Sequence, residues 1–208
     1  MSKHVTVALA AMLAVAASTG IAAAAGSPGT TQLKKIGEIQ VPLGKLTGFD
    51  ITAVDERTQR VFLADRDHGT VDVFDGKADK LIGSVPGFVG PRKGANGKID
   101  FGMSGPAGLL VYDNTVWAGD GDSTMKEIDL KTMKVVATVA TGGKNRSDEN
   151  AYDPKDHVVA GGNADDDPPF AAFVSTTKHK LIASYTLKNA TDGLEADLWN
   201  PADGNFYF

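Results

Sequence analysis

Hydrophobic residues along this chain occur in short runs that alternate with polar residues, which is the pattern of half-buried β-strands. Examples are Val71–Asp75, Met125–Asp129 and Lys134–Val139, each about the length of one strand. Gly, Asp, Asn and Pro interrupt these runs, and no segment after Gln32 shows a convincing helical spacing of apolar residues. The pattern therefore predicts an all-β protein.

The strand-like runs form an internal repeat. Units begin at Gly48, Gly105, Ser147 and Gly193, which lie 57, 42 and 46 residues apart, and an insertion over 87–102 lengthens the first interval. In the second unit the expected strands are Gly108–Tyr112, Thr115–Gly119, Thr124–Leu130 and Val135–Val139. A period of roughly 40 to 50 residues with four strands per unit is typical of a β-propeller blade.

We therefore expect an all-β fold, a β-propeller over residues 33–208, with blades at about 46–88, 103–143, 146–189 and 191–208. A generic antiparallel sandwich or meander would also show turn signals every 8 to 12 residues or so, but it would not repeat the same order of turns three times. The last blade is incomplete, and a strand near Ile36–Val41 precedes the first. Because propellers close with about 4 to 8 blades, we expect a truncated or incomplete ring, whose open blade edges favour self-association.

Two segments resemble the repeat of the YncE-like, YVTN-type β-propeller family. They are Thr70–Asp75 and Lys126–Gly143, which contain a strand, an aspartate turn and the strand Lys-Val-Val-Ala-Thr-Val. The resemblance extends over about three repeats, from Leu46 to the end of the chain. It implies the propeller fold and leaves the activity open, because propellers serve many unrelated functions.

The first 25 residues have the features of a cleavable signal peptide. Lys3 gives a short positive region, an apolar run follows over 5–17, and small residues continue through Ala25. A polar linker over 26–32 comes next. We therefore expect a periplasmic or secreted protein, and no segment approaches the roughly 20 apolar residues of a membrane span.

Composition narrows the partners and the chemistry. The chain has no cysteine, which excludes disulfides, cysteine catalysis and thiolate metal sites. Its formal net charge is −5, and removal of the signal peptide with Lys3 makes it more acidic. Nucleic acid is therefore not expected as a partner.

Acidic residues concentrate in the loops that enter each first strand and in the loops that join second to third strands. These loops lie on one face of a propeller, whereas the opposite turns contain lysine. Converging carboxylates become favourable when a hard divalent cation such as calcium neutralises them. The expected metal ligands are Asp50, Asp120, Glu149 and Glu195. Aspartate is also common in solvated turns, which need no ligand.

Further residues of this acidic face are candidates for ligand binding. Arg66 and Arg146 either pair with the carboxylates or hold an anionic ligand, and His68 is a candidate base or ligand. The full set of ligand-binding candidates is Arg66, His68, Asp122, Arg146, Asp148 and Asp165. The large aromatic residues of the repeats are instead expected to fill the wedges between neighbouring sheets; they are Phe62, Trp117, Trp199 and Tyr207.

Two functions remain open at this point. The first is an exported binding or scaffold propeller whose acidic face receives a protein or a small molecule without chemistry. The second is an enzyme similar to the lactonases of the SMP-30/gluconolactonase type, in which a divalent cation polarises a lactone carbonyl and activates water. We favour the first, because a fold alone does not confer activity.

Overall fold

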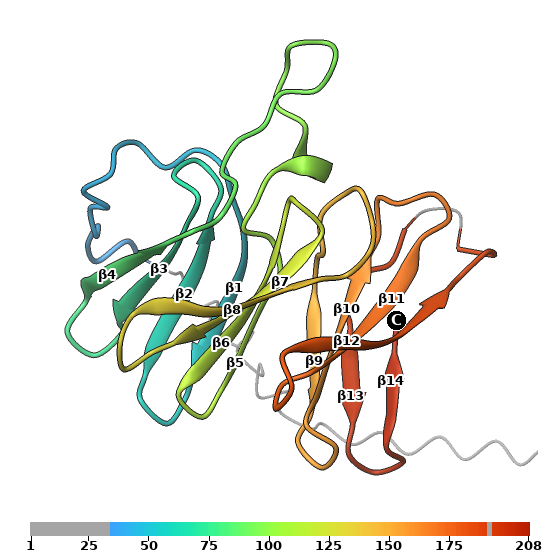
Figure 1. Cartoon of the computed structure of the whole chain (residues 1–208). Helices are drawn as coiled ribbons and strands as arrows, with labels where there is room; N and C mark the ends of the chain where they lie inside the picture. Colours follow the sequence, from blue (N-terminus) through green and yellow to red (C-terminus); the bar gives the residue numbers. More distant parts are fainter. Residues whose placement is uncertain (1–33, 191–192) are drawn as a thin grey trace, which may run out of the picture. The chain divides into compact units, whose positions relative to one another are not determined.

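The computed structural model describes residues 34–190 and 193–208. The expected signal peptide (1–25) and linker (26–32) lie outside these described residues. Three sheets of four antiparallel strands and one sheet of two follow one another along the chain (Figure 1). The first contains β1 (Phe49–Asp55), β2 (Arg60–Asp65), β3 (Thr70–Asp75) and β4 (Lys80–Pro86). The second contains β5 (Leu109–Tyr112), β6 (Thr115–Asp120), β7 (Thr124–Asp129) and β8 (Lys134–Ala140).

The third sheet contains β9 (Asn150–Asp153), β10 (Val158–Asn163), β11 (Phe170–Ser175) and β12 (Lys180–Thr186). The fourth contains β13 (Leu198–Asn200) and β14 (Asn205–Tyr207). Within each four-stranded sheet the strands lie in chain order, as they do in a propeller blade. The all-β propeller architecture is thus confirmed, and we refer to the sheets as blades 1 to 4.

One turn type recurs in every four-stranded blade and explains the repeated turn signals in the sequence. An aspartate at the end of a strand accepts hydrogen bonds from the backbone N–H groups two and three residues later; these aspartates are Asp55, Asp75, Asp129 and Asp153. The fourth residue after each one has a positive φ of 57°, 49°, 55° and 55° respectively. Aspartate at the first position closes such a turn with its own side chain.

A register shift also recurs at one place in each blade. The pairing of third and fourth strands slips between Val73 and Phe74, between Glu127 and Ile128, and between Phe173 and Val174. Such a bulge increases the local twist of a strand pair. Its repetition shows that the three blades are equivalent units.

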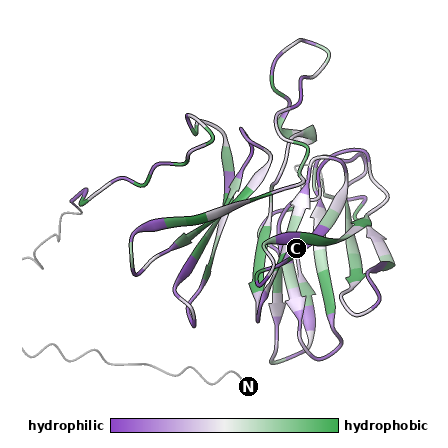
Figure 2. Ribbon diagram, turned by 60° about the vertical axis from the view of Figure 1, so that its left-hand side comes forward, coloured by the Kyte–Doolittle hydropathy of each residue, from purple (hydrophilic) through white to green (hydrophobic). Residues whose placement is uncertain are grey.

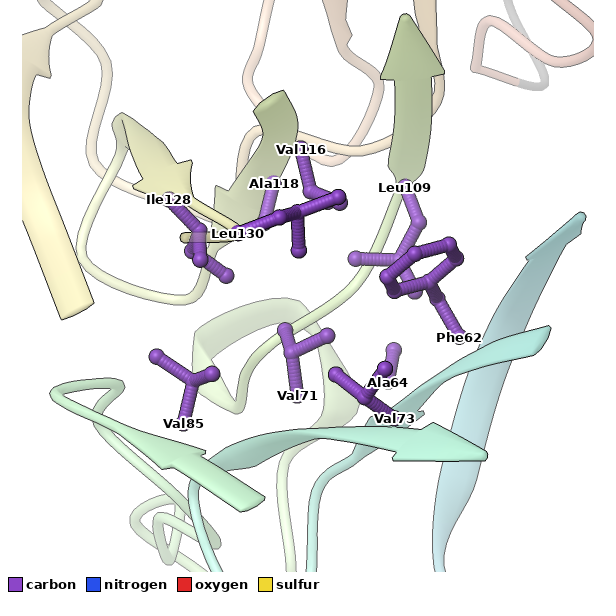
Figure 3. Packing of buried hydrophobic residues seen from close by; sticks show 10 residues of the cluster. All are labelled: Phe62, Ala64, Val71, Val73, Val85, Leu109, Val116, Ala118, Ile128 and Leu130. Carbon is purple, nitrogen blue, oxygen red and sulfur yellow. The ribbon is translucent and has the colours of Figure 1, made fainter. Parts of the chain in front are cut away.

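Neighbouring blades pack face to face through buried hydrophobic side chains. Blade 1 contributes Phe62, Ala64, Val71, Val73 and Val85, and blade 2 contributes Leu109, Val116, Ala118, Ile128 and Leu130 (Figure 3). A second cluster joins blades 2 and 3 through Trp117, Met125 and Val139 on one side and Val159 and Val174 on the other. Figure 2 shows hydrophobic residues along the strands and hydrophilic residues at the turns. Phe62 and Trp117 therefore pack between blades as expected, whereas Tyr207 is 48% exposed.

Two glycines bring the start of blade 3 into direct contact with blade 2. A Cβ atom at Gly108 would lie 2.0 Å from the carbonyl oxygen of Asp148, and one at Gly119 would lie 2.1 Å from that of Ser147. The Ser147 N–H donates to the carbonyl of Asp120, at 3.0 Å, and the Asp148 N–H to that of Gly162, at 2.8 Å. These contacts fix the segment that enters β9, which carries several of the predicted site residues.

The segments outside the blades differ from expectation in two places. The expected strand near Ile36–Val41 does not form: the described residues before β1 contain only turns and irregular backbone, and Ile36 is 90% exposed. The insertion between β4 and β5 carries a bridge between Lys93 and Ile99 and a short 3-10 helix, η1 (Phe101–Met103). In the described part of the chain, no helix has the length and apolar character to cross a bilayer.

Candidate functional site

Arg66 anchors a group of charged side chains that come from different blades. It lies in the turn between β2 and β3, is only 7% exposed, and forms an ion pair with Asp50 of β1. Its guanidinium lies 5.3 Å from the centre of the Phe101 ring of η1. Burial, and then repulsion by Arg146, lower the pKa of Arg66 to about 10. The insertion and blade 1 therefore meet at this side chain.

Arg146 lies just before β9 and binds the same region from blade 3. Its Nη2 lies 2.6 Å from Oδ2 of Asp148, and its Nε lies 3.2 Å from Oδ2 of Asp165. Its Nη1 donates to the carbonyl of Phe101, at 3.3 Å. Both arginines thus pair with carboxylates, one of the two outcomes that the sequence left open, and both hold η1 in place.

Carboxylates outnumber the arginines in this group. Burial raises the pKa of Asp148, although Arg146 and Arg66 partly oppose that rise. Burial, followed by repulsion from Asp148 and Glu149, also raises the pKa of Glu195. We name this group the acidic rim; it comprises Asp50, Arg66, Arg146, Asp148, Glu149, Asp165 and Glu195. Five carboxylates and two guanidinium groups leave it with an excess of negative charge.

Asp120, a predicted metal ligand, has a structural role instead. It is completely buried, and Nζ of Lys126 lies 2.5 Å from its Oδ2. Its carboxylate also accepts hydrogen bonds from the N–H groups of Gly121 and Val89. Asp122 lies beside this pair, with its Oδ2 at 3.6 Å from Nζ of Lys126. Lys126 supplies the charge neutralisation that a metal ion would otherwise provide.

His68, a predicted ligand or base, pairs with an aspartate at the start of its own turn. Its Nδ1 lies 2.6 Å from Oδ2 of the completely buried Asp65. The hydrogen bond to Asp65 raises the pKa of His68. The neighbouring Asp67 accepts hydrogen bonds from the N–H groups of Thr47 and Gly48. These contacts hold the chain that enters β1 against the turn between β2 and β3.

The four predicted metal ligands do not come together as a centre. Asp50 is paired with Arg66, and Asp120 is paired with Lys126. Among the residues that the structure describes, no group of three or more His, Cys, Asp or Glu side chains is arranged to hold a metal ion. The sequence offered Arg66 and Arg146 as partners of the carboxylates, but it did not identify Lys126 as the partner of Asp120.

A second feature, a groove that the sequence did not reveal, lies along the innermost strands. Its volume is about 480 Å³, and β5, β9 and β13 line it. The side chains that matter most are Leu110, Tyr112, Asn150, Tyr152, Asp197 and Trp199. The Tyr112 and Tyr152 rings are stacked, with centroids 3.8 Å apart. Trp199, expected only to fill a wedge between sheets, thus forms part of a groove wall.

Asp197 is the unusual residue of this groove. Both of its carboxylate oxygens are buried, and neither has a hydrogen-bond partner in the part of the chain that the structure describes. Burial raises its pKa to about 8, and repulsion by Glu149, Asp148 and Glu195 adds to that rise. The nearby Gly162 N–H partly opposes the rise in the pKa of Asp197. Its hydrogen bond, however, goes to the carbonyl of Glu149 and not to the Asp197 carboxylate. No signal in the sequence marks the groove: an aromatic residue directly precedes Asp or Asn at Tyr112, Tyr152 and Trp199, but the same pair occurs at Phe49 and Phe74, which do not line it.

Comparison with known proteins supports the propeller fold but assigns the chain to no family. No protein-family model and no curated protein matches the chain. Among solved structures, a chain of the hydrazine synthase of Kuenenia stuttgartiensis is similar, with a TM-score of 0.57 and 12% sequence identity. The match covers 74% of this chain and 40% of that chain. At such low identity the likeness concerns the fold alone.

The arrangement as a whole is suited to binding. The acidic rim can exchange its internal ion pairs for contacts with a ligand of positive charge, because carboxylates are in excess there. The groove adds aromatic surface and an unpartnered carboxylate. Sites that combine apolar walls with a few placed polar groups are typical of ligand binding.

Proposed function

We propose that this chain is an exported β-propeller protein of the YncE-like type that binds a basic partner at its acidic rim and performs no chemistry there. The observation that carries this proposal is the excess of carboxylates over guanidinium groups in loops from different blades. Export is supported by the positive, apolar and small-residue regions of the first 25 residues. The repeat segments Thr70–Asp75 and Lys126–Gly143 support the YncE-like assignment.

The partner that fits the rim best is a lysine- or arginine-containing segment of a protein. Such a segment can pair with Glu149, Glu195 and Asp165 while Arg66 and Arg146 keep their contacts with η1. Opposite charge on two surfaces steers their association and makes it sensitive to salt. A polyanion is disfavoured by the same charges.

The lactonase-like alternative has less support. A catalytic calcium site requires six to eight or so oxygen ligands around one cation. Asp50 and Asp120 direct carboxylate oxygens at Arg66 and Lys126 instead, so two of the four expected ligands are already neutralised. We therefore propose the binding function and not the hydrolase.

Titration of the protein with tetralysine tests this function. We expect saturable binding at low ionic strength that weakens strongly at about 0.5 M salt, since screening shortens the range of charge interactions to a few Å. Removing a rim charge with Asp165→Asn or Glu195→Gln should weaken binding by about threefold each, as expected for exposed ion pairs.

The matched controls are tetraglutamate, which should not bind, and Glu56→Gln, which removes an exposed carboxylate in the turn between β1 and β2. This variant should bind tetralysine like the unmodified protein. Equal losses in Glu56→Gln and Glu195→Gln would contradict the proposal, because they would show attraction to net charge rather than to the rim.

A further inference from the structure

The groove contains a carboxylate, that of Asp197, to which no cationic side chain of the described residues is paired. Both Asp197 oxygens are buried without a hydrogen-bond partner, and no salt bridge to Asp197 is present among the described residues. Burying an unpaired carboxylate is costly, so such groups in folded proteins normally have a partner. The structure therefore indicates that a cationic or hydrogen-bond-donating group belongs beside Asp197.

A second polar side chain in the same groove also has no partner. Asn150 is only 9% exposed, and neither its amide nitrogen nor its amide oxygen forms a hydrogen bond with any described residue. Its oxygen lies 2.8 Å from the position that a Cβ atom would take at Gly161, so the absence of a side chain there makes room for the amide. Two unsatisfied polar side chains on neighbouring innermost strands, β9 and the entry to β13, mark the groove as a binding site.

The rest of the groove wall is aromatic and apolar. Tyr112 and Tyr152 are stacked at its side, and Trp199 lies one residue beyond Leu198 on β13. Asp197 directly precedes β13, and both Asp197 and Trp199 line the groove. Aromatic faces attract cations, most strongly when the cation is shielded from water.

We propose that this groove binds a small primary alkylammonium ion, with Asp197 as its counter-ion and Trp199, Tyr112 and Tyr152 as its aromatic wall. A primary ammonium group fits because it donates up to three N–H bonds and can satisfy both Asp197 oxygens at once. A quaternary ammonium ion has no such donors. A divalent cation needs a larger set of oxygen ligands than one carboxylate and one amide supply.

This site is distinct from the acidic rim, and the inference does not rest on the proposed function. Asp197 feels the rim carboxylates Asp148, Glu149 and Glu195 only as repulsive charges. Their field also favours a cation in the groove. A partner bound at the rim and an amine bound in the groove are therefore separately testable.

Three matched probes test the proposal on the full chain: n-butylamine, n-butanol and n-butyltrimethylammonium. Binding is followed by two-dimensional NMR at pH 8.5, where Asp197 is largely ionised and an alkylamine with a pKa near 10 stays protonated. We expect butylamine to bind about tenfold or more tightly than either other probe, because a hydrogen bond to a charged group contributes about that factor. The shifted resonances should belong to β5, β9 and β13.

Substitutions separate this site from the rim. Asp197→Asn should weaken butylamine binding by about tenfold and leave butanol binding unchanged, whereas Asp165→Asn at the rim should change neither. Trp199→Leu should weaken it by a smaller factor, about threefold. Equal binding of butylamine and butanol to the unmodified protein would overturn the proposal, and this comparison stands even if Asp197→Asn fails to fold. Unchanged butylamine binding by a folded Asp197→Asn variant would overturn it as well.

Discussion

Replacing Lys126 with methionine is expected to destabilise the fold by about 3 to 5 kcal/mol at pH 8, since it leaves the buried Asp120 carboxylate without its cation. Lys126 is 6% exposed, donates to the carbonyl of Gly87 at 2.8 Å, and lies 5.3 Å from the centre of the Phe88 ring. It therefore joins β7 to the chain that leaves blade 1. Urea denaturation monitored by tryptophan fluorescence measures the loss.

The stability lost in Lys126→Met should depend on pH, because the protonation of Asp120 changes with it. Burial already raises the pKa of Asp120, and Lys126 opposes that rise. Without Lys126 the pKa rises further, so the folded variant retains a proton that the unfolded chain releases above its pKa of about 4. The destabilisation should consequently be smaller near pH 4 than at pH 8.

A second substitution provides the control for this pair. Adding Asp120→Asn to Lys126→Met removes the unpaired charge, while the amide oxygen can still accept from the Gly121 N–H. The double variant should recover at least about half of the lost stability, because the penalty for a buried charge has been removed. A loss below about 1 kcal/mol in Lys126→Met alone would show that the pair is solvated, which is typical of surface pairs.

Replacing Gly119 with alanine should destabilise the protein by about 3 kcal/mol, at the upper end for overpacking. A Cβ atom there would lie 2.1 Å from the carbonyl oxygen of Ser147 and 2.7 Å from that of Asp148. Both contacts are with backbone, which cannot rotate away as a flexible side chain can. The expected fall in Tm is roughly 6 to 12 °C for a domain of this size.

Gly83→Ala is the matched control for Gly119→Ala. A Cβ atom at Gly83, in β4, would lie 3.6 Å from Cε of Met133, an ordinary contact with a flexible side chain. This variant should stay within about 0.5 kcal/mol of the unmodified protein, as surface substitutions usually do. If both variants lost the same stability, the tight approach of blade 3 to Gly119 would be refuted.

Much of the fold could be predicted because its signals are local. The aspartate turns that follow Asp55, Asp75, Asp129 and Asp153 close through the side chain of their own first residue. Strand alternation and turn order then place the four strands of each blade. In the second blade the expected strand Thr115–Gly119 differs from the observed Thr115–Asp120 by one residue.

The site was predicted only in part because it depends on contacts between distant segments. Turn chemistry assigned Arg66, Arg146, Asp148 and Asp165 to one face, and in the structure these four side chains lie near one another. The partners of Asp120 could not be foreseen, since Lys126 reads in the sequence as an ordinary strand residue. Asp197 was missed for a related reason, since the sequence does not show whether a carboxylate has a partner. The backbone of β10 lies beside Asp197, but it pairs with β9 of its own blade.

The central claim is that loops from different blades meet at one acidic rim, and the pKa of Asp148, measured by carboxyl carbon-13 NMR, tests it most directly. Arg66 of blade 1 lowers the pKa of Asp148, which precedes blade 3. The pKa of Asp148 should therefore rise in Arg66→Gln and stay unchanged in Arg57→Gln, which removes an exposed arginine of the turn between β1 and β2. An identical Asp148 titration in the unmodified protein and in Arg66→Gln would contradict the account, because it would place these residues too far apart to share a rim.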